Sequence, residues 1–339
     1  MAETVTSNRH PRQPDQASAG HSAGSAAGPT AGPTAGPTAQ PSAAAPDIVA
    51  PTVAWFRSEA RDLPWRRPAT TAWSIMVSEF MLQQTPVVRV LPVHAIWLDR
   101  WPTPAALAAE PVGEAVRAWG RLGYPRRAMR LHAAATAVEA AFDGTVPADY
   151  DDLRTLPGVG EYTAAAIASF AYGRRHIVLD TNVRRVLARA VAGVEYPAPA
   201  TTPADRANAT SLLPEDPAAA SEWAAASMEL GAVLCTARSP RCDDCPIHGL
   251  CAWLAAGKPA YDGPPRKGQS YEGTDRQARG RLLAVLRDHH EPVHLEELDA
   301  AWPRDSVQRA RALASLVTDG LAVPVHDEWY SLAAAPAPR

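Results

Sequence analysis

The chain has 339 residues and a formal net charge of −3 at pH 7. This length allows a sizeable core and, at about 150 residues per domain, favours two domains over one. The negative charge speaks against a DNA-binding protein at first sight, but binding depends on where charge lies rather than on its sum. No stretch approaches the ~20 apolar residues needed to span a bilayer, which excludes an integral membrane protein.

Residues 1–50 are predicted to be a disordered tail. They contain repeated Ala-Gly-Pro-Thr units between residues 31 and 39 and lack large apolar side chains, so they cannot offset the entropy cost of ordering. The tail has no apolar run of the signal-peptide type, and we therefore expect a cytoplasmic protein.

A helix is predicted over 73–85. Large apolar side chains recur there at intervals of three and four: Trp73, Met76, Val77, Phe80 and Met81. Glu79 lies at the edge of that stripe, where a glutamate is usually solvated. Packed against apolar neighbours, its carboxyl would instead have a raised pKa suited to a general acid near neutral pH.

Arginine supplies almost all of the positive charge, because Lys258 and Lys267 are the only lysines. The arginines gather in three groups beside the motifs: Arg126, Arg127 and Arg130; Arg174 and Arg175; Arg184, Arg185 and Arg189. Phosphate contacts explain these groups, and a solvated helix face explains any one of them equally well.

A glycine-rich turn, 156–160, separates two predicted helices, 150–156 and 161–171. Gly158 and Gly160 permit a tight turn, and amides at the start of the second helix can bind a phosphate without reading sequence. The same pattern also closes ordinary helix pairs. Further along, Asp180 precedes a predicted helix, 183–190, where an aspartate commonly serves as an N-cap.

All four cysteines fall within seventeen residues, spaced Cys235-x6-Cys242-x2-Cys245-x5-Cys251. Four thiolates in one loop suit a tetrahedral zinc ion or an iron–sulfur cubane, and ligand chemistry alone does not separate the two. After a linker, 258–274, three helices are predicted over 275–289, 294–301 and 304–319. A hairpin over 321–332, turning near Asp327, completes a winged-helix-like module that could bind DNA or cap the core.

These motifs, taken in order, resemble those of the MutY-type adenine DNA glycosylases of the endonuclease III and helix-hairpin-helix-GPD superfamily. Residues 78–85, Ser-Glu-Phe-Met-Leu-Gln-Gln-Thr, are similar to the family signature S-E-x-M-L-Q-Q-T. The hairpin, the aspartate and the cysteine loop follow as in the family, and the six, two, five spacing resembles its [4Fe-4S] loop, 235–251. The resemblance runs from about 53 to 253.

The resemblance implies roles for four residues. Glu79 would protonate N7 of an adenine flipped out of the helix, and Asp180 would stabilise the oxocarbenium-like sugar. Asn182 would support this site. Tyr162 stands where bifunctional relatives carry a Schiff-base lysine, so we expect base removal to leave an intact abasic site.

The resemblance also implies DNA contacts. Gln84 would enter the space beside the opposing base, with Tyr124 inserted next to it. A second tyrosine usually follows in the family, whereas Pro125 follows here. The expected DNA-contacting residues are Gln83, Gln84, Thr85, Tyr124, Leu156, Gly158, Val159 and Gly160.

The resemblance therefore implies an all-α, two-lobed glycosylase domain, 51–257. The patterns beyond it predict the linker and the winged-helix-like module, 275–333. The expected partner is double-stranded DNA with adenine opposite 8-oxoguanine or guanine, bound at the nucleoid by a monomer, with the cluster as its cofactor. We find no counterpart of the family's Nudix-like domain and expect a short form.

Two alternatives stay open. One is a thymine or uracil mismatch glycosylase, although protonation by Glu79 serves only a purine. The other is a non-catalytic damage sensor, against which both carboxylates argue.

Overall fold

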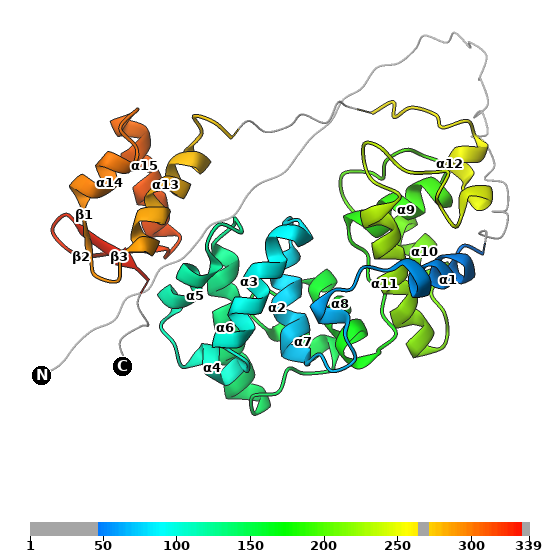
Figure 1. Ribbon diagram of the computed structural model, residues 1–339, viewed down its shortest axis with the longest axis horizontal. Coiled ribbons are helices and arrows are strands. Elements are labelled where there is room, and N and C mark those ends of the chain that lie inside the picture. Colours follow the sequence, from blue (N-terminus) through cyan, green and yellow to red (C-terminus); the bar gives the residue numbers. More distant parts are fainter. Residues whose placement is uncertain (1–46, 264–270, 334–339) are drawn as a thin grey trace, which may run out of the picture. The chain divides into compact units, whose positions relative to one another are not determined.

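The computed structural model describes residues 47–263 and 271–333, and Figure 1 traces its elements. The first lobe contains η1 (Pro64–Arg66), α2 (Ala72–Leu82), α3 (Val87–Arg100), α4 (Pro104–Ala108), α5 (Val112–Trp119), α6 (Arg126–Phe142), α7 (Tyr150–Thr155) and α8 (Glu161–Tyr172). The second lobe contains α1 (Val49–Glu59), α9 (Thr181–Ala190), α10 (Pro203–Ser211), α11 (Pro217–Val233), η2 (His248–Leu250) and α12 (Ala252–Ala255). The C-terminal module contains α13 (Asp275–Asp288), β1 (Val293–His294), α14 (Leu295–Ala301), α15 (Ser306–Thr318), β2 (Ala322–His326) and β3 (Trp329–Leu332).

Each lobe has a hydrophobic core of its own. The first core includes Trp97 and Leu131, and the second includes Ile48 and Leu230. A third, small patch packs α8 of the first lobe against α11 of the second through alanines such as Ala166. The predicted two-lobed helical fold is confirmed. No helix among the described residues is long and apolar enough to cross a membrane.

Helix α2 is buried on every side. It begins where the Thr71 hydroxyl accepts a hydrogen bond from the Ser74 amide, and all nine residues from Trp73 to Met81 are buried. Helices α3, α6 and α8 pack around it. The prediction of a one-sided apolar stripe was wrong, since Glu79 lies inside the lobe and not at the edge of a solvated face.

Helix α2 ends at Leu82, three residues before the predicted end. The Arg127 guanidinium donates to the carbonyl oxygens of Phe80, Met81 and Gln83 at 2.8, 3.0 and 2.6 Å. These bonds satisfy carbonyls that a helix end leaves without partners. A residue on α6 therefore stops the helix, and no pattern within 73–85 reports it.

The second lobe begins earlier than predicted. Ile48 has no exposed surface and belongs to the second core, and α1 starts at Val49. The prediction of disorder is wrong for residues 47–50, because Ile48 and the fully buried Thr52 supply apolar burial near the tail's end. The rest of the predicted tail, 1–46, lies outside the described residues.

The C-terminal module contains the three predicted helices and the predicted hairpin. Strands β2 and β3 pair antiparallel, and the short strand β1, which was not predicted, pairs with β3 to give the order β1-β3-β2. A strand of two residues is too short to show an alternating pattern. Of the predicted linker, residues 264–270 lie outside the described part of the chain.

The module packs directly on the first lobe, and the two share one core. Gly113 of α5 allows close approach, because a Cβ there would lie 2.6 Å from the Ala333 carbonyl oxygen and 3.2 Å from Leu332 Cβ. Arg287 Nε donates to the Val116 carbonyl oxygen at 3.0 Å.

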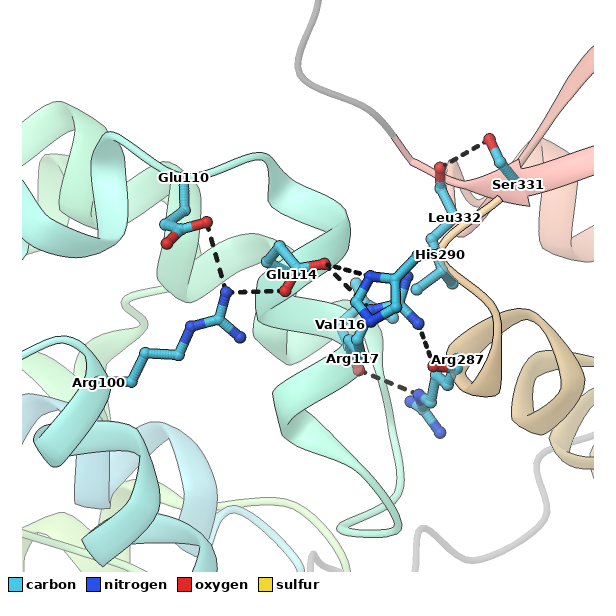
Figure 2. A network of polar contacts seen from close by, with 9 residues as sticks. All are labelled: Arg100, Glu110, Glu114, Val116, Arg117, Arg287, His290, Ser331 and Leu332. Carbon is cyan, nitrogen blue, oxygen red and sulfur yellow. Dashed lines mark hydrogen bonds and ion pairs between the residues drawn. The ribbon is translucent and has the colours of Figure 1, made fainter. Parts of the chain in front are cut away.

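Charged side chains extend this contact, as Figure 2 shows. Glu114 of α5 accepts from Arg100 at 2.7 Å and Arg117 at 3.0 Å, and it lies 4.0 Å from His290 of the module. Arg117 in turn donates to the Arg287 carbonyl oxygen. The fold therefore fastens the module to α5.

Candidate active site

Glu79 has 4% of its surface exposed. Burial raises the pKa of its carboxyl to about 7; the Asp180 charge adds to the rise, while the Tyr162 hydroxyl and the Arg66 guanidinium oppose it. Its Oε2 atom is buried and has no hydrogen-bond partner among the described residues. The carboxyl can therefore hold a proton near neutral pH and present one oxygen to a bound group.

Asp180 is the N-cap of α9. Its Oδ1 accepts from the Val183 amide at 2.6 Å, and its Oδ2 accepts from Asn182 Nδ2 at 2.8 Å. Burial raises its pKa above the ordinary value, while these two hydrogen bonds oppose the rise. The capping interpretation and the catalytic one are compatible, because capping fixes the carboxylate.

Tyr162, in the first turn of α8, brings the two carboxyls into one site. Burial, together with the charges of Glu79 and Asp180, raises the pKa of its phenol well above the ordinary value. The phenol therefore stays neutral. Three elements, α2, α8 and the start of α9, thus converge on a single buried group of side chains.

A hydrogen-bonded chain leads from Asp180 to the cysteine loop. Asn182 Oδ1 accepts from Arg185 Nη2 at 2.9 Å, and Arg185 Nε donates to the Cys235 carbonyl oxygen at 2.7 Å. Arg185 also donates to the Gly231 carbonyl oxygen at 2.6 Å. Asn182 is therefore held from both sides, and the order of the cysteine loop is coupled to the orientation of Asp180.

A buried ionic group beside Glu79 was not predicted. Glu229 of α11 accepts from Arg61 Nε at 2.6 Å and from Arg66 Nη2 at 2.9 Å. Burial alone would raise the pKa of Glu229, but the two arginines bring it down to about 2. Arg66 Nη1 is buried without a partner among the described residues. No spacing signal could reveal this group, because Glu229 lies more than 160 residues from both arginines.

The predicted DNA-contacting segment after α2 divides into buried and exposed residues. Gln84 is exposed and has a φ of 54°, in the left-handed region. Thr85 is buried, and its hydroxyl donates to the Leu122 carbonyl oxygen at 3.2 Å and accepts from Arg127 at 2.9 Å. Gln83 Nε2 lies 3.4 Å from the Thr163 hydroxyl. The Thr85 side chain therefore holds the loop and is not available to DNA.

Tyr124 lies on the neighbouring loop, 49% exposed and with a φ of 48°. Arg127 donates to the Gly123 carbonyl oxygen at 3.0 Å, so one guanidinium organises both exposed loops. Pro125 stands at the N-cap of α6 with an ordinary helical conformation. Proline therefore fits at this position, where the family usually has a second tyrosine, because the position is the start of a helix.

In the hairpin only Gly158 requires glycine for its conformation. Its φ is 81°, and a Cβ there would lie 2.8 Å from Arg130 Cβ. Gly160 has a φ of −91° and no described atom within 4 Å of a built Cβ, so its surroundings are open. The Leu156 and Val159 side chains are buried, which leaves only their backbones for DNA.

Some members of two arginine groups are structural. Arg184 donates to Asp205 at 2.9 Å, and Arg189, 1% exposed, donates to Cys235 Sγ at 3.3 Å. With Arg127 these residues are buried, so neither a DNA contact nor a solvated helix face accounts for them. Residue counts do not reveal burial.

The four cysteines line one cavity, together with apolar side chains such as Ile247 and Trp253. Burial, together with the charges of the other three cysteines, raises the pKa of Cys245 to about 11. Mutually repelling thiolates require a positive centre. Four cysteine side chains on one cavity are the donor set that a [4Fe-4S] cluster takes.

Comparison with known proteins agrees with this geometry. The family model described as HhH-GPD superfamily base excision DNA repair protein matches residues 77–206, and the iron-sulfur binding domain of endonuclease III matches 235–251. An adenine DNA glycosylase of Mycobacterium tuberculosis is 53% identical over 280 residues, 83% of this chain and 91% of that protein. A thymine-DNA glycosylase of Aeropyrum pernix is 35% identical over 205 residues, 59% and 91% of the two chains.

Solved structures show the same fold. A thermostable thymine-DNA glycosylase has a TM-score of 0.55 at 25% identity over 61% of this chain and 95% of that chain. A non-covalent endonuclease III–DNA complex has a TM-score of 0.53 at 22% identity over 62% and 94%.

Fold, hairpin and cysteine loop together define an iron–sulfur protein of base excision DNA repair. The chain belongs to the HhH-GPD superfamily and, within it, to the adenine DNA glycosylase family. Its cofactor is a [4Fe-4S] cluster, and the matched loop, 235–251, contains the four cysteines that line the cavity.

Proposed function

We propose that the protein hydrolyses the N-glycosidic bond of adenine paired with 8-oxoguanine or guanine in double-stranded DNA. One observation carries this proposal: the Glu79 and Asp180 carboxyls meet at one site beside Tyr162, each with different hydrogen-bond partners. Glu79 has a pKa of about 7, while Asp180 accepts two hydrogen bonds, which favour its ionised form. Acid and charge stabiliser are then both present at neutral pH.

The two carboxyls divide the reaction between them. With the adenine extruded from the stack, Glu79 donates its proton to N7, and the electrons of the bond between C1′ and N9 move into the purine. Asp180 stabilises the positive charge left on the sugar. Water then adds to C1′ and loses a proton, which leaves an abasic site. Asn182 keeps the Asp180 carboxylate in place.

Tyr162 explains why the strand stays intact. Strand cleavage through an imine needs an amine near C1′, and this site holds a neutral phenol instead. The first lysine of the chain is Lys258, beyond both lobes. We infer a monofunctional glycosylase; strong lyase activity would contradict this.

DNA would be held by the hairpin and the two exposed loops. The first-turn amides of α8 follow Gly160, which makes no side-chain cap, so they can bind a phosphate. Gln84 and Tyr124 would enter the duplex beside the opposing base. The bound cluster supplies iron–thiolate bonds that close the loop 235–251. One chain supplies every residue of this site, and we infer a monomer acting at the nucleoid.

The test is base release from defined duplexes. Purified protein is incubated with adenine opposite 8-oxoguanine, guanine or cytosine and with thymine opposite guanine, and strands are compared before and after heating in alkali. We expect cleavage only after alkali, and only with adenine opposite 8-oxoguanine or guanine. Glu79→Gln should lose most excision while keeping its affinity for the duplex. Preferred release of thymine would replace this proposal with a thymine mismatch activity.

A further inference from the structure

A side chain of the C-terminal module lies against the proposed DNA-inserting tyrosine. The guanidinium carbon of Arg276, in the first turn of α13, is 5.8 Å from the centre of the Tyr124 ring and 5.4 Å from that of Tyr271. Tyr124 and Tyr271 are about half exposed, and Arg276 is exposed. The module therefore contributes a positive charge to the loop that would enter the duplex.

The position of Arg276 is set by the first lobe. Arg126 of α6, two residues after Tyr124, pairs with Asp319 of the module at 3.1 Å, and Asp319 also binds Arg279 of α13. A Cβ at Gly320 would lie 3.2 Å from Met129 of α6. These contacts join α13 to the start of α6 and keep Arg276 beside Tyr124.

Arg276 has no internal anion to neutralise. Its neighbour Asp275 accepts two hydrogen bonds from Arg311, each at 2.7 Å. Within residues 47–263 and 271–333 no acidic side chain forms an ion pair with Arg276. An exposed guanidinium held in place but without an acidic partner is suited to a phosphate, which it can bind with two parallel hydrogen bonds.

Two more arginines extend this charge toward the hairpin. Arg121 precedes Tyr124 on the same loop, and Arg130 packs against Gly158. Both are exposed, and neither has an acidic partner in the described part of the chain. Positive charge therefore continues from the phosphate-binding hairpin, past Tyr124, to the module.

We propose that the C-terminal module is part of the DNA-binding surface and that Arg276 donates hydrogen bonds to a backbone phosphate of the strand carrying the base opposite adenine. This inference rests on the proposed function, which places Tyr124 beside that base. The alternative is that Arg276 only covers the Tyr124 ring. Loss of a phosphate contact changes the salt dependence of binding, whereas loss of a purely structural contact does not.

The test compares Arg276→Ala with Arg281→Ala, which removes the same charge from an exposed position on the same helix. Full-length proteins matched for iron content bind a duplex with tetrahydrofuran, a stable abasic analogue, opposite 8-oxoguanine, and Kd is measured by fluorescence anisotropy across a salt series. Arg276→Ala should weaken binding by about tenfold, the value of one charge-assisted hydrogen bond. The slope of log Kd against log salt should fall by about 0.9.

The two controls should behave differently from Arg276→Ala. Arg281→Ala should match the wild type in both Kd and slope, and Arg276→Lys should recover the slope because it keeps the charge. A neutral methylphosphonate placed in turn at each linkage around 8-oxoguanine should weaken the wild type at one linkage and leave Arg276→Ala unaffected there. A wild-type slope in Arg276→Ala, or equal sensitivity of both proteins at every linkage, would overturn the inference.

The assay separates this inference from the proposed function. If the wild type releases no adenine but Arg276→Ala still loses salt-dependent affinity, the activity is wrong and the DNA contact stands. If the wild type releases adenine and Arg276→Ala binds normally, the contact is wrong and the activity stands.

Discussion

Glu79 shows how burial alone can prepare a side chain for acid catalysis. Its carboxyl lies inside the apolar first lobe, where a negative charge loses solvation and the proton is held more tightly. The nearby charge of Asp180 acts in the same direction. The Tyr162 hydroxyl and the Arg66 guanidinium lower the pKa, but burial outweighs them.

The first prediction concerns pH. The folded-state pKa of Glu79, about 7, lies above the ordinary glutamate pKa of 4.5, so the folded protein binds this proton more tightly than the unfolded chain. The associated stability is fully present below pH 4.5 and is lost as pH rises through about 7. Glu79→Gln has no such proton to lose. In urea unfolding, the free energy of unfolding of the variant should therefore rise relative to that of the wild type as pH increases. Single-turnover adenine release by the wild type should fall above about pH 7; a rate unchanged well above that pH would contradict the assignment of Glu79.

At the scale of elements, the close approach of α9 and α11 determines where Asp180 lies. A Cβ on Gly231 of α11 would lie 2.8 Å from Asn182 Cβ and 2.9 Å from its carbonyl oxygen. Neither helix can move apart freely, because Arg185 bonds to the Gly231 and Cys235 carbonyl oxygens. Gly231 is therefore needed inside α11, because a larger residue would collide with Asn182.

Gly231→Ala should therefore damage the site from a distance. We expect a loss of about 1–3 kcal/mol in the free energy of unfolding, because the added methyl has no space. Adenine release should fall more than duplex affinity, since Asn182 moves together with Asp180. Gly280→Ala is the control: a Cβ there meets only the Tyr271 hydroxyl, at 3.4 Å, so the change should be neutral or stabilising by up to about 1 kcal/mol. Equal effects of the two substitutions would refute this account.

The sequence patterns predicted where the helices lie but not which residues surround them. The apolar spacing placed helix α2, and the family signature pointed to Glu79, but neither could show that α2 is enclosed on all sides. Asp180 was recognisable from its place after the hairpin. The group of Arg61, Arg66 and Glu229 was not, because ion pairs between distant segments leave no local pattern.

At the scale of the whole molecule, the module and the first lobe form a single folded body. The half-buried Arg287 guanidinium, whose pKa burial lowers to about 10, bonds to α5, and apolar side chains of the module and the first lobe belong to one core. The sequence predicted the module's helices but not this docking surface, because Gly113 and Val116 look like ordinary helix residues until their partners are known.

Arg287→Ala should loosen the module. Removing the guanidinium leaves the Val116 carbonyl oxygen without its donor, at a cost of about 1–3 kcal/mol. Hydrogen exchange should rise in both α5 and α13 while α9 and α11 stay protected, with Arg281→Ala as the unaffected control. A rise confined to α13 would mean that the docking bond contributes nothing to α5.

The separation of the two cores has a mechanical consequence. Helices α8 and α11 meet through small alanine side chains, and among the described residues the module shares apolar packing with the first lobe alone. Any movement of one lobe against the other would therefore carry the module with α2 and α6. Such a movement would change the distance between Glu79 and Asp180, which belong to different lobes. It would leave Tyr124 and Arg276 at the same distance, so their contacts with one DNA strand would be kept while the two carboxyls separate.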